Sequence, residues 1–229
     1  MKKNLLIVVF CLLSTSLMAQ MGGKRVTVGL SVGPSIDWLG PKTEGYEGNG
    51  AKMGLRYGIP VDINFTEANN YYFSTGILFS HSGGKLKFTD YRPDQNVPEV
   101  ADISRKYNSI YISIPTGVKL KAPNFGDFVV AGNFGFYHGF LLSSRYVDSY
   151  NGSRDSRKAD FKRANFFKES LYVGLGVEYI IQDDFRASLY INYSYTLTNY
   201  FKNKTNNEYT GQKERANLNC LEFIFGIQF

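Results

Sequence analysis

The chain has 229 residues and a formal net charge of +6, with 18 Phe and 17 Tyr but only 20% charged residues. So many aromatic residues and so few charges exclude a disordered chain, and the modest positive charge gives no reason to expect a nucleic-acid partner. After the first twenty residues no apolar run is long enough for a membrane helix, which excludes a multi-helix membrane protein. A membrane β-barrel stays possible, because its apolar and polar residues alternate.

Residues 1–19 have the pattern of a secretory leader. Lys2 and Lys3 form a basic start, residues 5–13 form a short apolar run, and a small, polar exit follows. The apolar run is too short to cross a bilayer. We therefore predict a cleaved signal peptide over residues 1–19 and one barrel domain over residues 20–229.

Eight later segments alternate apolar and polar residues with a period of two, the pattern of a strand with two different faces. In chain order they are residues 26–33, 55–63, 73–80, 110–121, 128–137, 171–179, 185–198 and 220–229. The seventh is the clearest, because Leu189 and Ile191 lie on one face while Ser188 and Asn192 lie on the other. No helix gives this alternation, since its same-face neighbours are three and four residues apart.

The connections between these strands alternate strictly between short and long. Residues 64–70, 122–127 and 182–184 form the short ones, and the other four are long, polar and rich in glycine and charge. An even strand number with short periplasmic turns and long outer loops is typical of outer-membrane barrels. We therefore predict an all-β fold, a monomeric eight-stranded antiparallel up-and-down transmembrane β-barrel in the outer membrane with both termini periplasmic.

The polar faces of the predicted strands carry charged residues, and the alternation places all of them on the same side of the sheet. These residues are Arg56, Asp62, Lys119, Glu178, Arg186 and Glu222. An eight-stranded lumen is narrow, and buried charges must pair. We predict an internal network that plugs the barrel, with Arg186 beside Glu178 or Glu222, and we do not expect a general porin.

The opposite faces are long and apolar, with aromatic residues near the strand ends. Examples are Tyr179, Tyr193, Tyr195, Tyr200 and Phe201. Aromatic side chains at both ends of a span suit the two membrane interfaces. We therefore predict that this face contacts lipid. A soluble periplasmic barrel of the lipocalin type, with the apolar face inward around a ligand, stays open as an alternative.

Three motifs point to a known family: NSIYISIPTGVKLK at residues 108–121, STGILFSHSGGK at 74–85, and GIQF at 226–229. With these motifs, and an Ala-Gln junction after the leader, the chain resembles the PorT-like outer-membrane β-barrel family of the Bacteroidota. The resemblance implies an integral outer-membrane protein whose last residue, Phe229, is read by the barrel-assembly machinery. Some family members serve protein secretion or gliding. The motifs mark architecture and transfer no catalytic residue.

No metal or cofactor is expected. After the leader the chain has His81, His138 and Cys220, which lie in or at the ends of three different predicted strands without the spacing of metal ligands. Cys220 alone also allows no internal disulfide.

The sharpest enzymatic alternative is a lipid-modifying hydrolase at the outer rim, with a serine, a histidine and a carboxylate. Residues 80–82 read Ser-His-Ser, and His138 is followed by Ser143 and Ser144. A triad needs the base within hydrogen-bond reach of the nucleophile, and the sequence fixes no such distance. We therefore predict that the protein is not an enzyme.

A basic segment follows the fifth predicted strand, over residues 143–165. Its cations are Arg145, Arg154, Arg157, Lys158, Lys162 and Arg163. Outside the cell these residues would face the phosphates of lipopolysaccharide, which Arg and Lys bind well. A solvated loop without a ligand is the simpler interpretation.

The function predicted from these features is a structural or loop-mediated binding role in the outer membrane, with membrane lipid and lipopolysaccharide as partners. A lipid-modifying enzyme, an accessory of protein secretion and the soluble ligand-binding barrel stay as alternatives.

Overall fold

The computed structural model describes residues 26–66, 70–91, 99–150, 153–154, 158–159, 162–182 and 185–229. The predicted leader lies outside these ranges. The long strands are β1 (Val26–Pro41), β3 (Lys52–Asn64), β4 (Tyr71–Tyr91), β5 (Val100–Lys121), β6 (Phe128–Tyr150), β9 (Phe167–Gln182), β10 (Phe185–Thr196) and β11 (Ala216–Gln228). The two-residue strands are β2 (Glu47–Gly48), β7 (Ser153–Arg154) and β8 (Lys158–Ala159). Within the described ranges, no helix is long and apolar enough for a membrane span.

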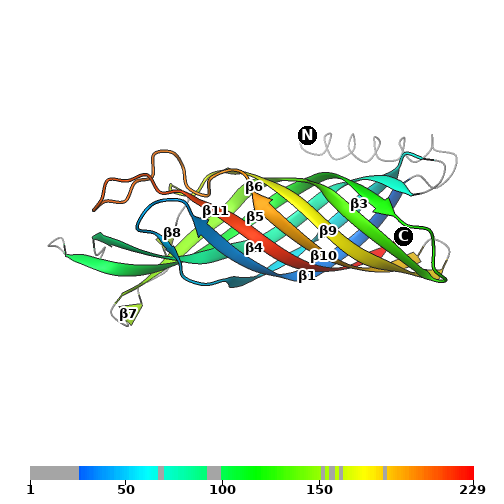
Figure 1. Ribbon diagram of the computed structural model, residues 1–229, viewed down its shortest axis with the longest axis horizontal. Helices are drawn as coiled ribbons and strands as arrows, with labels where there is room; N and C mark the ends of the chain where they lie inside the picture. The colour runs from blue at the N-terminus through cyan, green and yellow to red at the C-terminus, as the bar shows by residue number, and fades with distance from the viewer. Residues whose placement is uncertain are drawn as a thin grey trace, which may run out of the picture.

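The long strands form a closed antiparallel barrel (Figure 1). Neighbours in the chain pair with one another, and β1 pairs with β11 to complete the circle. The predicted eight-stranded barrel fold is therefore confirmed. Gly29 lies opposite Gln228, so the start of β1 and the end of β11 are side by side.

The short connections join Asn64 to Tyr71, Lys121 to Phe128 and Gln182 to Phe185, close to the predicted bounds. They are at the same end as Val26 and Phe229, which we call the turn end. The opposite end, where β4, β5 and β6 project beyond the other strands, is the hairpin end (Figure 1).

The strands at the hairpin end are longer than predicted. The segment expected to end at Ser80 continues as strand to Tyr91, and β6 continues to Tyr150. The reason is a change of face at Gly83–Gly84. On β4 the outward positions up to Phe79 are mostly apolar, although Leu78 points inward, whereas beyond the glycines the apolar residues Leu86 and Phe88 point inward. A search for one continuous apolar face therefore stops too early.

Strand β5 shows the same reversal along a single outward face. Near the turn end its outward residues are apolar except for Thr116: Ile110, Ile112, Ile114, Val118 and Leu120. Toward the hairpin end they are polar or charged apart from Val100 at the strand tip: Asp102, Ser104, Lys106 and Asn108. We call the apolar part of the barrel exterior the belt, and its edge on β5 lies between Asn108 and Ile110.

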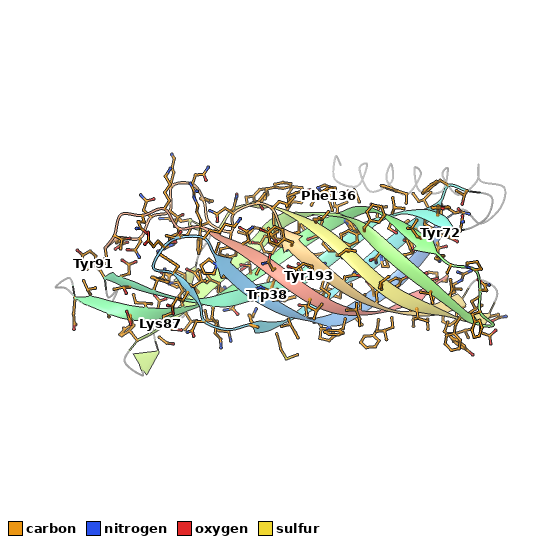
Figure 2. All side chains as sticks on the ribbon, viewed as in Figure 1. Trp38, Tyr72, Lys87, Tyr91, Phe136 and Tyr193 are labelled. Atoms are coloured by element: carbon orange, nitrogen blue, oxygen red, sulfur yellow. The ribbon has the colours of Figure 1, made fainter. Side chains whose placement is uncertain are left out.

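The belt continues around the barrel. Leu175 is 69% exposed and Leu30 is 58% exposed, both on the outer wall. Trp38 stacks on Tyr193 with ring centroids 6.2 Å apart, and both residues lie on this wall (Figure 2). In the belt the apolar face thus points outward, opposite to what the lipocalin-type alternative requires.

The hairpin end has an apolar core of its own, which we call the cap. Its buried residues are Leu39, Tyr46, Leu86, Phe88, Ile103, Tyr107, Tyr111, Leu141, Ala164, Tyr200, Phe201, Ala216 and Leu218. The prediction that Tyr200 and Phe201 lie at the lipid interface is wrong, because they are 3% and 1% exposed. The connection from β10 to β11 turns inward there. The Tyr200 hydroxyl is 2.7 Å from Ser109 Oγ and 3.1 Å from Ser144 Oγ.

Candidate functional site

The barrel lumen within the belt holds the six charged residues that the sequence placed on one face. Arg56, Asp62, Lys119, Glu178 and Glu222 are at most 5% exposed. The Arg186 side chain is 25% exposed. They come from β3, β5, β9, β10 and β11, because inward positions of a strand recur at every second residue.

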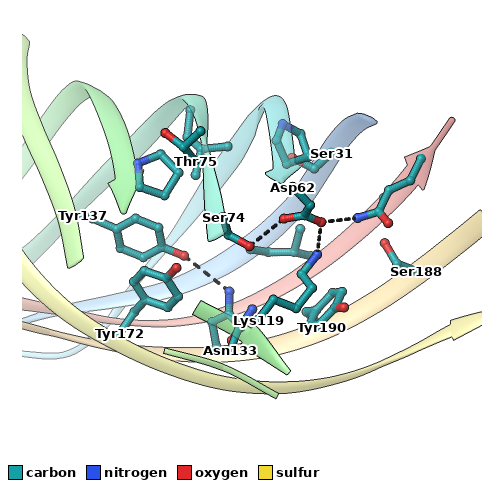
Figure 3. A pocket seen from close by; sticks show the side chains of 17 residues that line it. Ser31, Asp62, Ser74, Thr75, Lys119, Asn133, Tyr137, Tyr172, Ser188 and Tyr190 are labelled. Carbon is teal, nitrogen blue, oxygen red and sulfur yellow. Dashed lines mark hydrogen bonds and ion pairs between the residues drawn. The ribbon is translucent and has the colours of Figure 1, made fainter. Parts of the chain in front are cut away.

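Near the turn end these charges form a chain of contacts, of which Figure 3 shows the one between Lys119 and Asp62. Lys119 Nζ contacts Asp62 Oδ2 and lies 3.7 Å from Glu178 Oε1. Glu178 Oε2 also lies 2.7 Å from Lys121 Nζ and 3.4 Å from Arg186 Nη1. Ser74 donates a 2.5 Å hydrogen bond to Asp62. Each carboxylate therefore has cationic or hydroxyl partners, as a buried charge requires.

A second cluster lies further toward the hairpin end. Arg56 Nη2 is 2.6 Å from Glu222 Oε1, and the guanidinium carbon is 4.5 Å from the centre of the Tyr137 ring. Tyr137 donates a 3.4 Å hydrogen bond to Glu222. Of the two partners considered for Arg186, the structure gives Glu178, while Glu222 pairs with Arg56.

Some members of the lumenal network were not predicted from the sequence. Lys121 has the same parity as Lys119, so counting along the strand would have found it. Asp37 and Lys168 are also buried in the barrel, but they lie in segments that were taken for loops. Arg105 and Asp148 were missed for the same reason.

The lumen also contains a small cavity of about 80 Å³ between the two clusters (Figure 3). The side-chain amide oxygens of Asn133, Asn192 and Gln228 border it and accept no hydrogen bond from the described residues. A cavity of this size that is bordered by such polar atoms has room for water. It is far too small for a diffusion channel.

The cap contains buried ion pairs among its apolar side chains. Arg105 donates to both carboxylate oxygens of Asp148, at 2.5 and 2.9 Å. Glu214, which is 1% exposed, contacts Arg163 and accepts a 3.1 Å hydrogen bond from the Tyr46 hydroxyl. These contacts fix the cap to the ends of the barrel strands.

The predicted basic segment is therefore not one solvated loop. Arg145 is exposed on β6, and Arg163 is tied to buried Glu214. Lys162 is an exposed turn residue. Arg154 lies in β7 and Lys158 in β8, whereas Arg157 lies outside the described residues.

A group of cations that shares Arg145 with this segment lies just beyond the belt edge on the outer wall. Lys85 on β4 is directly opposite Lys106 on β5, and Arg145 on β6 is opposite Asn108. Like charges directly opposite each other on neighbouring strands are destabilising. None of the ion pairs between described residues involves these three cations. We call Lys85, Lys106 and Arg145 the cation shelf.

The two histidines lie on the outer wall in different surroundings. His81 Nε2 is 3.5 Å from the Tyr57 hydroxyl. His138 Nδ1 is 2.8 Å from Glu169 Oε2, and its Nε2 is 2.7 Å from Thr116 Oγ1. Sequence reasoning singled out His138 but missed both partners. Only the strand register, with His138 directly opposite Glu169, shows that they meet.

The serines proposed as nucleophiles are not beside His138. Ser144 is buried and lies 3.2 Å from Ser109 Oγ. Ser80 and Ser82 are buried on the inner face of β4. Among the described residues, no group of three or more His, Cys, Asp or Glu side chains is placed to hold a metal ion.

Comparisons with solved structures return proteins of low sequence identity. Neisserial surface protein A is 11% identical with a TM-score of 0.45, covering 91% of this chain and 100% of that one. The protease OmpT of Escherichia coli is 12% identical, with a TM-score of 0.41 and coverages of 92% and 99%. Ail of Yersinia pestis, in complex with the heparin analogue sucrose octasulfate, is 15% identical, with a TM-score of 0.37 and coverages of 90% and 99%.

A search among curated protein sequences gave no match. The profile of one protein family, described as outer membrane protein beta-barrel domain, matches residues 18–227. This match extends over all eight long strands, and its architecture agrees with the closed antiparallel barrel. The chain belongs to the outer membrane protein beta-barrel domain family.

Proposed function

We propose that the protein is a PorT-like outer-membrane barrel that forms no general pore and acts through the surface of its hairpin end. The observation that carries this proposal is the double closure of its interior. Ion pairs fill the lumen within the belt, and the apolar cap fills it at the hairpin end. A barrel closed in both zones offers its outer surfaces, not its lumen, to a partner.

Single-channel recording in planar bilayers tests the closed interior. The purified, full-length protein is expected to give no steady conductance above that of the same bilayer without protein. Stable open channels in the native protein would contradict the proposal.

We place the turn end in the periplasm and the hairpin end outside the cell. The short turns and both ends of the barrel sheet share one side, as in other bacterial outer-membrane barrels. Lys87→Cys places a thiol at the hairpin end, and Asn124→Cys places one in a short turn; both positions are exposed. A membrane-impermeant maleimide should label Lys87→Cys on intact cells and Asn124→Cys only after permeabilisation. The reverse pattern would contradict this orientation.

We further propose that the partner at the outer surface is the phosphate region of lipopolysaccharide. The cation shelf supports this, because Lys85 and Lys106 face each other just beyond the belt edge, where we expect lipid head groups to begin. Anionic phosphate would relieve their repulsion and accept their hydrogen bonds.

Lipopolysaccharide binding to the triple variant Lys85→Gln, Lys106→Gln, Arg145→Gln tests this partner. We expect this variant to bind lipopolysaccharide at least tenfold more weakly than the native protein does. Binding by the native protein should also fall more steeply as salt is added. The variant Lys42→Gln, Lys202→Gln, Lys213→Gln removes the same charge elsewhere and serves as control. Equal binding by both triple variants would contradict the proposal.

A further inference from the structure

Three polar side chains form a connected row on the outer wall of the barrel, within the belt. Thr116 on β5, His138 on β6 and Glu169 on β9 are all partly exposed and share the outward face with apolar neighbours. The contact from Thr116 Oγ1 to His138 Nε2 is 2.7 Å, and that from His138 Nδ1 to Glu169 Oε2 is 2.8 Å.

The register of the three strands explains why these residues meet. His138 is directly opposite Glu169 on β9 and directly opposite Ile114 on β5. Thr116 is two residues beyond Ile114, which makes it the diagonal neighbour of His138 on the same face, within reach of a long side chain. The row is therefore held by the sheet itself and needs no loop to form.

The hydrogen-bond directions in this row follow from the chemistry of its members. An ionised carboxylate only accepts hydrogen bonds, so Nδ1 of His138 carries the proton that is donated to Glu169. In that tautomer Nε2 is an acceptor, and the Thr116 hydroxyl donates to it. A hydroxyl on the base nitrogen, with a carboxylate orienting the opposite nitrogen, is the arrangement of an activated nucleophile.

The surroundings of the row are apolar and face lipid. Ile114, Phe136 and Leu171 flank it and are 41–44% exposed. The Phe136 ring also stacks on the imidazole, with centroids 6.5 Å apart. Ionisable side chains on such a surface are costly, and in a membrane they point to a functional site.

We propose that Thr116, His138 and Glu169 form an acyl-transfer site that hydrolyses an ester-linked acyl chain of a membrane lipid. The apolar flanks hold the acyl chain, and the ester group lies against Thr116. Thr116 is the nucleophile, His138 is the general base and acid, and Glu169 orients the imidazole and stabilises its charged form.

The reaction balances with water as the only co-reactant. Thr116 Oγ1 attacks the carbonyl carbon while its proton moves to His138 Nε2, and the ester C–O bond breaks as that proton passes to the departing alcohol. Water then attacks the acyl-threonine and gives a proton to Nε2. The bond from Thr116 to the acyl group breaks, Thr116 takes the proton back, and a free fatty acid leaves.

The experiment measures fatty acid release by mass spectrometry, with the purified full-length protein in two kinds of vesicle. One contains phospholipid alone, and the other also contains lipopolysaccharide, so the two arms identify which lipid supplies the ester. We expect release in at least one arm. Release should fall roughly 10²-fold or more in Thr116→Val and His138→Gln, because both remove a reacting group.

Matched variants separate catalysis from folding. Thr89→Val and His81→Gln remove a hydroxyl and an imidazole elsewhere on the outer wall and should keep the native rate. Thr116→Ser keeps the nucleophile and should retain activity, whereas a structural hydrogen bond alone would give no release in any variant. No release by the native protein in either arm, or equal release by Thr116→Val and Thr89→Val, would overturn the proposal.

Discussion

The belt zone and the hairpin zone are built from the same strands, but they place apolar and charged side chains on opposite sides of the barrel wall. Within the belt the exterior is apolar and the interior holds ion pairs such as Arg56–Glu222. In the hairpin zone the exterior carries Lys85 and Lys106, and the interior is the apolar cap. The two zones are inverted with respect to each other, and on β5 the exterior changes between Asn108 and Ile110.

This inversion follows from the medium around each zone. Lipid accepts apolar side chains and leaves the narrow lumen to polar groups, which must then satisfy one another. Water around the hairpin zone has the reverse effect, and apolar area is buried inside as in a soluble protein. Stability should therefore depend on paired charges in one zone and on apolar packing in the other.

The largest effect is expected from breaking a charge pair in the belt zone. Arg56→Met leaves Glu222 as an unpaired buried carboxylate, which costs about 3–5 kcal/mol of unfolding free energy. Adding Glu222→Leu should recover most of the loss. Urea unfolding in lipid vesicles measures both variants. If the double variant were less stable than Arg56→Met, the charge pair would not be the source of the effect.

A large but local effect is expected from the cap. Phe201 packs edge-on against Tyr107 and Tyr200, with centroids 5.4 and 5.0 Å away, so Phe201→Ala opens a cavity costing about 3 kcal/mol. Hydrogen exchange should become faster in the cap while the belt strands keep their protection. Phe225→Ala on the lipid-facing wall is the control. If Phe201→Ala accelerated hydrogen exchange equally in the cap and in the belt strands, the two zones would not be independent.

A smaller effect is expected from the Tyr46 hydroxyl, which donates to Glu214 and accepts a 3.0 Å hydrogen bond from Asn207. Tyr46→Phe should cost the cap about 1–2 kcal/mol.

The same hydroxyl predicts a pH dependence. Burial and then the charge of Glu214 raise the pKa of Tyr46 above its ordinary value of 10.0. The folded cap thus favours the protonated phenol, and the resulting stabilisation is complete below pH 10.0 and lost above it. Tyr46→Phe should lack this alkaline loss in exchange measurements. An identical alkaline decline in the variant would contradict the assignment.

The smallest effect is expected at an exposed pair of the hairpin zone. The 2.9 Å hydrogen bond from Thr89, followed by contacts with Lys87, lowers the pKa of Asp102 below 3.8. Thr89→Val and Lys87→Met should each move this pKa back toward its ordinary value. Carbon NMR titration of the carboxyl group measures both shifts. Unfolding above pH 3.8 should not change measurably, because an exposed ion pair contributes little.

The sequence predicted the belt zone well because period two is strict there. Leu189 and Ile191 against Ser188 and Asn192 define a strand without any knowledge of its neighbours. The same alternation predicted which charged residues share the lumenal face.

The hairpin zone and the row at His138 could not be predicted in this way. Beyond Gly83 the apolar residues change face, so Leu86 and Phe88 no longer continue the earlier pattern. Glu169 lies more than thirty residues from His138 along the chain. Whether the two residues are neighbours depends on the strand register, which the alternation alone does not fix.

The most direct test of the inversion is a spin-label scan along the outward face of β5 in lipid vesicles. Single cysteines at Ser104, Lys106, Asn108, Ile110, Ile112 and Ile114, in a Cys220→Ser background, each carry one label. We predict high accessibility to a water-soluble nickel reagent up to Asn108 and a change to high oxygen accessibility from Ile110 onward. A uniform accessibility along all six positions, or a change at a different place, would contradict the two-zone structure.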